Sequence, residues 1–274
     1  MSKIILELKN LLDKHPRATN SYKRNLLKEY LQFFVLDYIY SSDKYNELIF
    51  YGGSALAQCY ALPRLSEDLD FVDIRKTIDL DELSNDLGVY FKKELGLIAN
   101  KKIQKFRIYL KFPILRELGI SDASQSNFLN LKVEIFKGFD FCDNFKTELK
   151  PTFRHNQSVL IKTFDLPTLM ATKIRAVLYR KWEKINKSGE TIISVKGRDY
   201  FDLMWYLQKG ITPNFDCLED VDGPKDLKIK LLKIIEKIDS KSIILDLENF
   251  VNDVHFVKNL GKNIKEILKN EILK

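Results

Sequence analysis

The feature that most constrains this chain is a glycine-rich turn followed by two closely spaced aspartates. A short apolar run at 48–51 is broken by Gly52-Gly53-Ser54. The run predicts a strand that enters a tight turn, with a short helix over 54–60 after it. Glycine lets the main chain approach a ligand closely, and the N-terminus of a helix offers N–H groups to an anion. The segment therefore predicts a cradle for phosphate.

Of the two aspartates, Asp70 lies on a segment that reads as a second strand, over 69–72, and Asp68 directly precedes it. Side chains alternate between the two faces of a strand, so both carboxylates project to one face. Carboxylates held this close repel one another unless a cation lies between them. Their oxygens suit Mg²⁺ bound together with substrate phosphates, as in phosphoryl or nucleotidyl transfer. Either motif alone is common in turns and helix caps, so their combination indicates the site.

Hydrophobic periodicity divides the rest of the chain into an α/β part and a helical part. Alternating apolar and polar residues predict half-buried strands over 105–112 and 128–136, and another strand is predicted over 159–163. After Asp165, a predicted helix cap, the pattern is almost wholly helical. We therefore expect an α+β fold with two domains, 1–164 and 165–274. Helices are predicted over 3–14, 21–41, 79–94 and 166–185, from about 198, and over about 225–238, 243–254 and 260–273.

Charge and cysteine content narrow the class of protein. The formal net charge is +7, which fits a polyanionic partner such as nucleic acid or nucleotide phosphates, and equally fits a solvated basic surface. No apolar segment is long enough to span a membrane, and the N-terminus does not resemble a secretory signal. Cys59, Cys142 and Cys217 are far apart and odd in number, so we expect neither a disulfide framework nor a zinc site. A reducing cytoplasm is the expected compartment.

The Gly-Ser turn and the Asp-x-Asp pair together resemble the signature of nucleotidyltransferases of the DNA polymerase β type. More narrowly, Gly-Gly-Ser-Ala-Leu at 52–56 and Arg-Leu-Ser-Glu-Asp-Leu-Asp-Phe at 64–71 resemble the AbiEii family. These are the nucleotidyltransferase-like toxins of type IV toxin–antitoxin and abortive-infection systems. The resemblance extends through residues 21–210. It implies a polymerase-β-like domain with a mixed sheet, a C-terminal helical domain, and a nucleotide bound between them.

Two later segments carry the same resemblance. Lys173 and Arg180 are seven residues apart on a predicted helix and so share a face. The family has a lysine at this place that is taken to contact the nucleotide phosphates, and Lys173 matches it. The segment at 198–203 resembles the family's Arg-Asp-x-x-Asp-Leu motif, which bears an essential aspartate. Asp199 and Asp202 are three residues apart and could face one site, although one of them could instead cap a helix.

The third carboxylate of a polymerase-type site has two candidates. Glu134 occupies a polar-facing strand position, whereas the family resemblance favours Asp199 as the base. We prefer Asp199 for the base and keep Glu134 as a metal ligand. The resulting assignment is catalytic for Asp68, Asp70, Lys173 and Asp199, nucleotide-binding for Gly53, Ser54, Arg64, Ser66, Lys173, Arg180 and Asp202, and metal-binding for Asp68, Asp70 and Glu134.

Together these observations predict a Mg²⁺-dependent nucleotidyltransferase that uses an NTP, with two metal ions at the site. The resemblance implies an RNA acceptor, with the 3′ end of tRNA as one candidate, and a toxin opposed by a separately encoded antitoxin. Two alternatives remain open from the sequence. The nucleotidyl group could go to a protein side chain, or the chain could be a nucleotide-binding regulatory module with little turnover.

Overall fold

The computed structural model describes residues 2–180, 183–185 and 191–274. The chain forms two compact units, each with its own packed interior. The first consists of residues 1–139 and 148–163, and the second of residues 140–147 and 164–274. No helix in the part of the chain that the structure describes is both long and apolar enough to cross a membrane.

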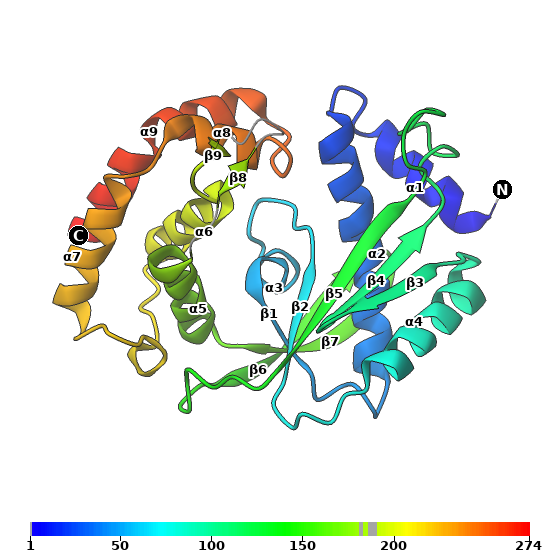
Figure 1. Cartoon of the computed structure of the whole chain (residues 1–274), viewed down its shortest axis with the longest axis horizontal. Coiled ribbons are helices and arrows are strands. Elements are labelled where there is room, and N and C mark those ends of the chain that lie inside the picture. The colour runs from blue at the N-terminus through cyan, green and yellow to red at the C-terminus, as the bar shows by residue number, and fades with distance from the viewer. Residues whose placement is uncertain (1, 181–182, 186–190) are drawn as a thin grey trace. The chain divides into compact units, whose positions relative to one another are not determined.

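The first unit is built on a seven-stranded mixed sheet (Figure 1). Its strand order is β3-β4-β5-β2-β1-β7-β6. The central strands β1 and β2 are antiparallel to each other, while β2 runs parallel to β5 and β1 runs parallel to β7. The strands are β1 (Ile49–Tyr51), β2 (Leu69–Asp73), β3 (Asn100–Gln104), β4 (Arg107–Phe112), β5 (Leu129–Lys137), β6 (Thr147–Arg154) and β7 (Gln157–Phe164).

Helices pack against this sheet and leave one of its faces polar at the centre. They are α1 (Lys3–Asp13), α2 (Asn20–Ser41), α3 (Gly52–Cys59) and α4 (Leu80–Leu95). Helix α2 packs on β5, and α4 packs on β3 and β4. The inward-facing apolar residues of β4 and β5 are fully buried in this core, among them Ile108, Leu110, Leu131 and Val133. Because strand side chains alternate, the neighbouring polar residues of the same strands project from the opposite face.

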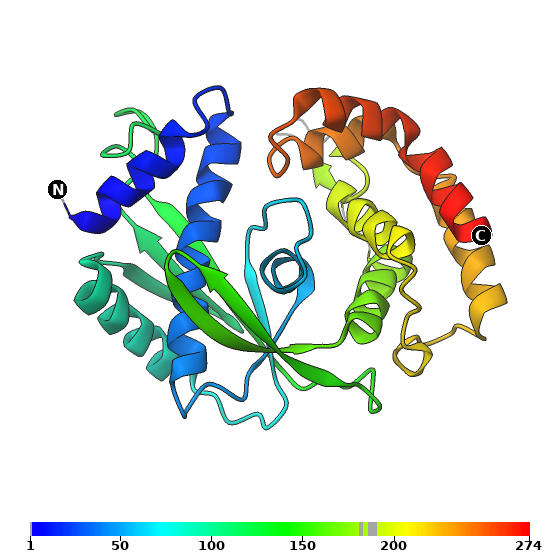
Figure 2. The ribbon, with the colours of Figure 1, turned by 180° about the vertical axis from the view of Figure 1, so that it is seen from behind.

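The second unit is mainly helical. Helix α5 (Leu166–Tyr179) is capped by Asp165, whose carboxylate accepts from Thr168 N, and it packs on α6 (Gly197–Gln208). Helix α9 (Val254–Leu273) packs on α6, on α7 (Pro224–Ile235) and on α8 (Ser240–Leu247), as Figure 2 shows from behind. The remaining described elements are the short strands β8 (Lys184–Ile185) and β9 (Thr191–Ile193) and the 3₁₀ helix η1 (Phe215–Cys217).

Segment 140–147 belongs to the second unit because its side chains contact that unit. Cys142 forms a disulfide with Cys217, and their Cα atoms are 4.5 Å apart. Asn144 donates to Asp216, and the Arg175 guanidinium lies over the Phe141 ring. The expectation of no disulfide was therefore wrong. The two cysteines are 75 residues apart in sequence, and only the tertiary fold brings them together.

The predicted α+β fold is confirmed, with identifiable errors. Helix α5 ends at Tyr179, short of the predicted 185, because Arg180 adopts extended backbone. Helices α8 and α9 begin earlier than predicted because Asp239 and Asp253 cap them, which apolar periodicity does not reveal. Helix α8 also ends at Leu247, short of the predicted 254. The short strands β8 and β9, in the segment expected to be almost wholly helical, were not predicted. Strands β3 and β6 were missed as well. Both lie at the edges of the sheet, where one face or both are exposed and the apolar pattern is weak.

Candidate active site

The glycine-rich turn is the start of α3. Gly52 has a positive φ of 79°, and a Cβ atom there would lie 2.7 Å from Asp70 Oδ2. A Cβ atom on Gly53 would lie within 2.4 Å of Arg64 Nη2, so the Arg64 guanidinium covers this glycine closely. Both glycines are therefore required for close approach by charged side chains. The first N–H groups of α3 have no partner within the helix, as at any helix N-terminus, and suit an anion.

Ser54 and Ser66 serve the local structure. The Ser54 hydroxyl is buried and donates to the carbonyl oxygen of Asp68 at 2.5 Å, which ties the start of α3 to the start of β2. The Ser66 N–H donates to Glu29 of α2 at 3.2 Å. Burial raises the pKa of Glu29, although the cations Arg154 and Arg64 and the Ser66 hydrogen bond oppose this shift. Both serines thus hold the loop that precedes the two aspartates.

Three acidic side chains of the first unit, Asp68, Asp70 and Glu134, are here called the carboxylate cluster. Strand register places Asp70 beside Glu134, and Asp68, one residue before β2, shares the Lys132 ammonium with Glu134. Asp70 on β2 pairs in register with Tyr51 on β1 and with Glu134 on β5. Glu134 in turn pairs with Arg107 on β4. Residues in register project to the same face, so this row crosses four strands on the polar face of the sheet. The sequence-predicted carboxylates are thus neighbours.

Two cations already contact the carboxylate cluster. Lys132 Nζ lies 2.7 Å from Asp68 Oδ2 and 2.8 Å from Glu134 Oε1. Arg107 Nε donates to Glu134 Oε1 at 2.8 Å. Burial works against the charged form of Lys132, but its hydrogen bonds and ion pairs with Asp68 and Glu134 outweigh this and raise its pKa. Burial and Glu67 raise the pKa of Asp68, while Lys132 partly opposes the shift.

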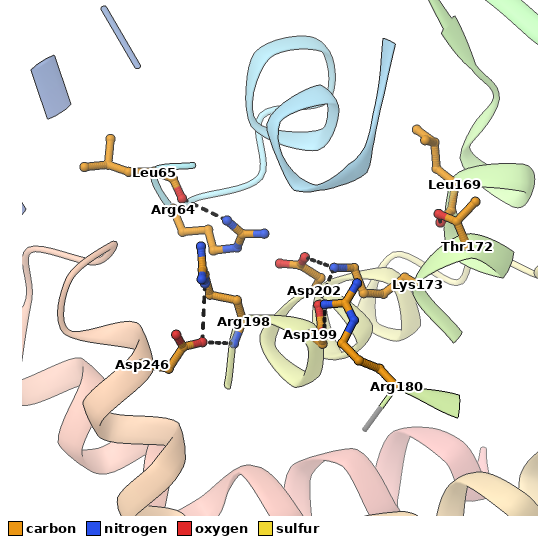
Figure 3. Close-up of polar contacts among 10 residues, drawn as sticks. All are labelled: Arg64, Leu65, Leu169, Thr172, Lys173, Arg180, Arg198, Asp199, Asp202 and Asp246. Carbon is orange, nitrogen blue, oxygen red and sulfur yellow. Dashed lines mark hydrogen bonds and ion pairs between the residues drawn. The ribbon is translucent and has the colours of Figure 1, made fainter. Parts of the chain in front are cut away.

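A second group of charged side chains lies between α5 and α6 in the second unit: Lys173, Arg180, Asp199 and Asp202, here called the α5–α6 ion cluster (Figure 3). Lys173 Nζ lies 2.7 Å from both Asp199 Oδ1 and Asp202 Oδ2, and Arg180 Nη1 lies 3.0 Å from Asp199 Oδ2. Asp202 is fully buried. Neither aspartate caps α6 with its side chain, so that alternative is wrong.

The electrostatics of this cluster follow from its burial. Burial alone would raise the pKa of Asp199, but Lys173, Lys196 and Arg180 hold that pKa far below its usual range. Lys196 shows the opposite effect, because burial and the nearby cations Arg198 and Arg180 lower its pKa to about 8. Lys196 and Arg180 contribute to a small hollow, which is lined by Ala176, Val177, Arg180, Ser194, Val195, Lys196, Asp199 and Tyr200. Such a hollow suits an anionic group.

Sequence reasoning missed three of these cations. Lys132 and Arg107 each occupy a polar position on an alternating strand, as ordinary solvated basic residues do. Their residue type and position therefore do not distinguish them from other basic residues. The two-residue spacing places Lys132 on the same strand face as Glu134, whereas only strand register reveals that Arg107 pairs with Glu134. Lys196 precedes the segment at 198–203 by two residues, and this proximity is a signal that could have identified it as a candidate site residue. Among the described residues, no group of three or more acidic, histidine or cysteine side chains is arranged to hold a metal ion.

Comparison with known proteins adds a family. The model of the family described as nucleotidyl transferase AbiEii toxin, type IV toxin–antitoxin system, matches residues 35–268. Among solved structures, JHP933 from Helicobacter pylori is similar with a TM-score of 0.49 and 17% identity, covering 91% of this chain and 93% of that one. A proposed nucleotidyltransferase from H. pylori is similar with a TM-score of 0.48 and 17% identity, covering 90% and 96%. No curated protein matches the chain.

Proposed function

The chain belongs to the AbiEii family of nucleotidyltransferase toxins of type IV toxin–antitoxin systems, and from this premise we propose that it transfers NMP from an NTP to RNA, with the 3′ end of tRNA as acceptor. The reaction releases pyrophosphate. The observation that carries the proposal is the row that places Asp70 beside Glu134 and beneath the start of α3. Carboxylates next to a phosphate-binding helix N-terminus are what nucleotidyl transfer requires.

A divalent cation fits the carboxylate cluster. Asp68 and Asp70 supply the oxygen donors that Mg²⁺ prefers, and the cluster already draws an ammonium group to within 2.8 Å of two of its members. Asp68 and Asp70 are the residues that would hold the ion. When bound, Mg²⁺ supplies positive charge that stabilises the negative charge on the transferring phosphoryl group.

The basic side chains of the second unit are assigned to the triphosphate. Lys173 and Arg180 are assigned to its oxygens. In the first unit, Gly53 and Arg64 are assigned to nucleotide binding. Asp202 positions the Lys173 ammonium, which lies 2.7 Å from its carboxylate. Asp199 has a low pKa here because Lys173 and Arg180 pair with it. A triphosphate competes with Asp199 for these cations, which raises its proton affinity and lets it accept the proton of the attacking hydroxyl.

Two features support an RNA acceptor. The formal net charge of +7 favours association with a polyanion. The polar face that carries the carboxylate cluster continues along β4 and β3, where Tyr109 pairs in register with Lys102. An aromatic ring beside a cation suits a single strand with its phosphates and bases. We place the reaction in the cytoplasm, where NTPs and RNA are both present. The family implies an antitoxin that counteracts the toxin.

Labelled transfer tests this function directly. The wild-type protein is incubated with total tRNA, Mg²⁺ and each α-³²P-labelled NTP in turn, beside the double variant Asp68→Asn, Asp70→Asn. We expect label on RNA from the wild type alone, with one NTP preferred. Label on protein would indicate that the acceptor is a protein side chain and not RNA. Measurable NTP binding without label on either would indicate a nucleotide-binding module and overturn the proposal.

Gly52→Ala is expected to lower transfer by about 100-fold. The new methyl group meets Asp70 Oδ2 at 2.7 Å and displaces that carboxylate, and misplacement by about 1 Å can cost that much. Gly96→Ala is the matched control. Gly96 also has a positive φ, of 64°, but nothing lies within 4 Å of its added Cβ. Both variants place a side chain at a positive φ, but only Gly52→Ala meets Asp70, so transfer by Gly96→Ala should stay near the wild-type rate. An equal loss in both would contradict the role given to Gly52.

A further inference from the structure

The hollow beside the start of α6 is lined by a cation that has no direct partner. Lys196 precedes α6 and lines this hollow together with Arg180, which follows α5. Within the residues that the structure describes, the Lys196 ammonium forms neither an ion pair nor a hydrogen bond. Its neighbouring cations each have a carboxylate partner: Lys173 with Asp199 and Asp202, Arg180 with Asp199, and Arg198 with Asp246 (Figure 3).

This arrangement is unfavourable for the protein alone. Burial lowers the pKa of Lys196 to about 8, the cations Arg198 and Arg180 act in the same direction, and Asp199 opposes them from beyond contact distance. Lys196 also stands at the N-terminal end of α6, where the helix dipole disfavours a positive charge and no side chain caps the helix. A half-buried cation without a partner, in a hollow among other cations, is typical of a ligand site, because a bound anion supplies the missing charge.

The hollow suits a small anion with several oxygens. Its walls include the apolar residues Ala176, Val177 and Val195. Apolar walls limit the access of water and so strengthen the attraction between a bound anion and the cations. The Arg180 guanidinium contacts Asp199 through Nη1 and has further N–H donors on Nη2 and Nε. A guanidinium and an ammonium that line one hollow therefore fit a phosphate group.

We propose that this hollow binds the terminal phosphate of the NTP and that Lys196 donates to its oxygens. A terminal phosphate carries about two negative charges near neutral pH and three acceptor oxygens, whereas an internal phosphate of RNA carries a single charge. It therefore matches Lys196 and Arg180 together better than an RNA phosphate does. The inference rests on the proposed function in taking an NTP as the substrate, and it adds Lys196 to the residues assigned to the triphosphate.

Nucleotide binding tests the proposal without reference to transfer. Isothermal titration calorimetry of the full chain in Mg²⁺ measures the affinity for an NTP analogue that cannot be cleaved at the α-phosphate, with each of the common bases in turn. The corresponding NMP, which lacks the terminal phosphate, is titrated beside it. Lys196→Met should weaken binding of the analogue by about tenfold or more and leave binding of the NMP within about twofold. Lys209→Met, the same substitution at the exposed C-terminal end of α6, should bind both ligands as the wild type does.

The pH dependence identifies the group that binds the phosphate. The protonated amine is the binding form, so the affinity of the wild type for the analogue should fall by about eightfold between about pH 7.5 and 9, as Lys196 of the free protein loses its proton. Neither Asp199, whose pKa is far below its usual range, nor Tyr200, whose pKa is raised to about 12, titrates there. Lys196→Arg should keep the affinity and lose this pH dependence, because a guanidinium stays charged. The other charged groups around Lys196 are ion-paired, and their titration would persist in Lys196→Arg: Lys173, Arg180, Arg198 and Asp246.

Unchanged binding of the analogue by a Lys196→Met protein whose circular dichroism and melting temperature match the wild type would overturn the proposal. Equal losses for the analogue and the NMP would overturn it as well, as would a wild-type affinity that is constant over this pH range. Weaker binding of tRNA by Lys196→Met, with binding of the analogue unchanged, would assign the hollow to an RNA phosphate instead. Loss of analogue binding in Lys196→Met without label transfer by the wild type would contradict the proposed function and leave this inference standing.

Discussion

Asp70→Asn is expected to lower nucleotidyl transfer by about 10³-fold or more while the protein stays folded. Asp70 is central in the row that joins β1, β2 and β5, and it lies against the first residue of α3. Asparagine keeps the shape of the side chain but removes its charge, and so weakens metal binding at the carboxylate cluster. Loss of several kcal/mol of transition-state stabilisation corresponds to a rate loss of about this size. Initial rates of label transfer at saturating NTP measure it.

Asp73→Asn is the control on the same strand. The Asp73 carboxylate is buried and accepts from Ile78 N at 2.8 Å, a bond that the amide oxygen of asparagine can also accept. Its side chain projects from the opposite face of β2, because it is three residues from Asp70. We expect transfer by Asp73→Asn to stay within about threefold of the wild type, since no charge at the cluster changes. An equal loss of transfer in both variants would mean that removing a charge anywhere on β2 lowers the rate. That result would contradict the role of Asp70 as a metal ligand.

Lys173→Met is expected to destabilise the second unit by about 3–5 kcal/mol at pH 7, the range found when one partner of a buried ion pair is removed. The substitution takes the ammonium away from both Asp199 and Asp202, of which Asp202 is fully buried. Urea unfolding followed by tryptophan fluorescence measures the change. The two tryptophans of the sequence, at 182 and 205, both fall in the residue range of this unit.

The pH dependence separates lost charge from lost packing. The pKa of Asp199 is lowered in the folded state, so its ion pairs stabilise the fold above the pKa of an unfolded aspartate, about 3.9, and that contribution is lost as the pH falls further. The gap in unfolding free energy between the wild type and Lys173→Met should therefore shrink on acidification. The double variant Lys173→Met, Asp202→Asn should recover part of the loss at pH 7. A gap that stays constant with pH would assign the effect to packing.

Much of the first unit was predictable because its signals are local. Each signal involves only a few neighbouring residues: the apolar run at 48–51, the two glycines, and the spacing of Asp68 and Asp70. The structure has β1, α3 and β2 at these positions. Local signals fail at the sheet edges. Strand β3 has one apolar residue among five, and β6 contains Pro151, so neither shows the alternation of a buried strand.

The sequence by itself determined the strand–turn–helix, the Asp-x-Asp pair at the start of β2, and the helices that carry Lys173, Asp199 and Asp202. Tertiary structure alone decided what these groups contact. Glu134 and Lys132 are more than 60 residues from Asp68 and Asp70, and only the parallel pairing of β2 with β5 places them side by side. Likewise, Cys142 meets Cys217 across 75 residues. The physical reason is that charge compensation acts over a few ångströms in space, whereas hydrophobic periodicity reports only on neighbours along the chain.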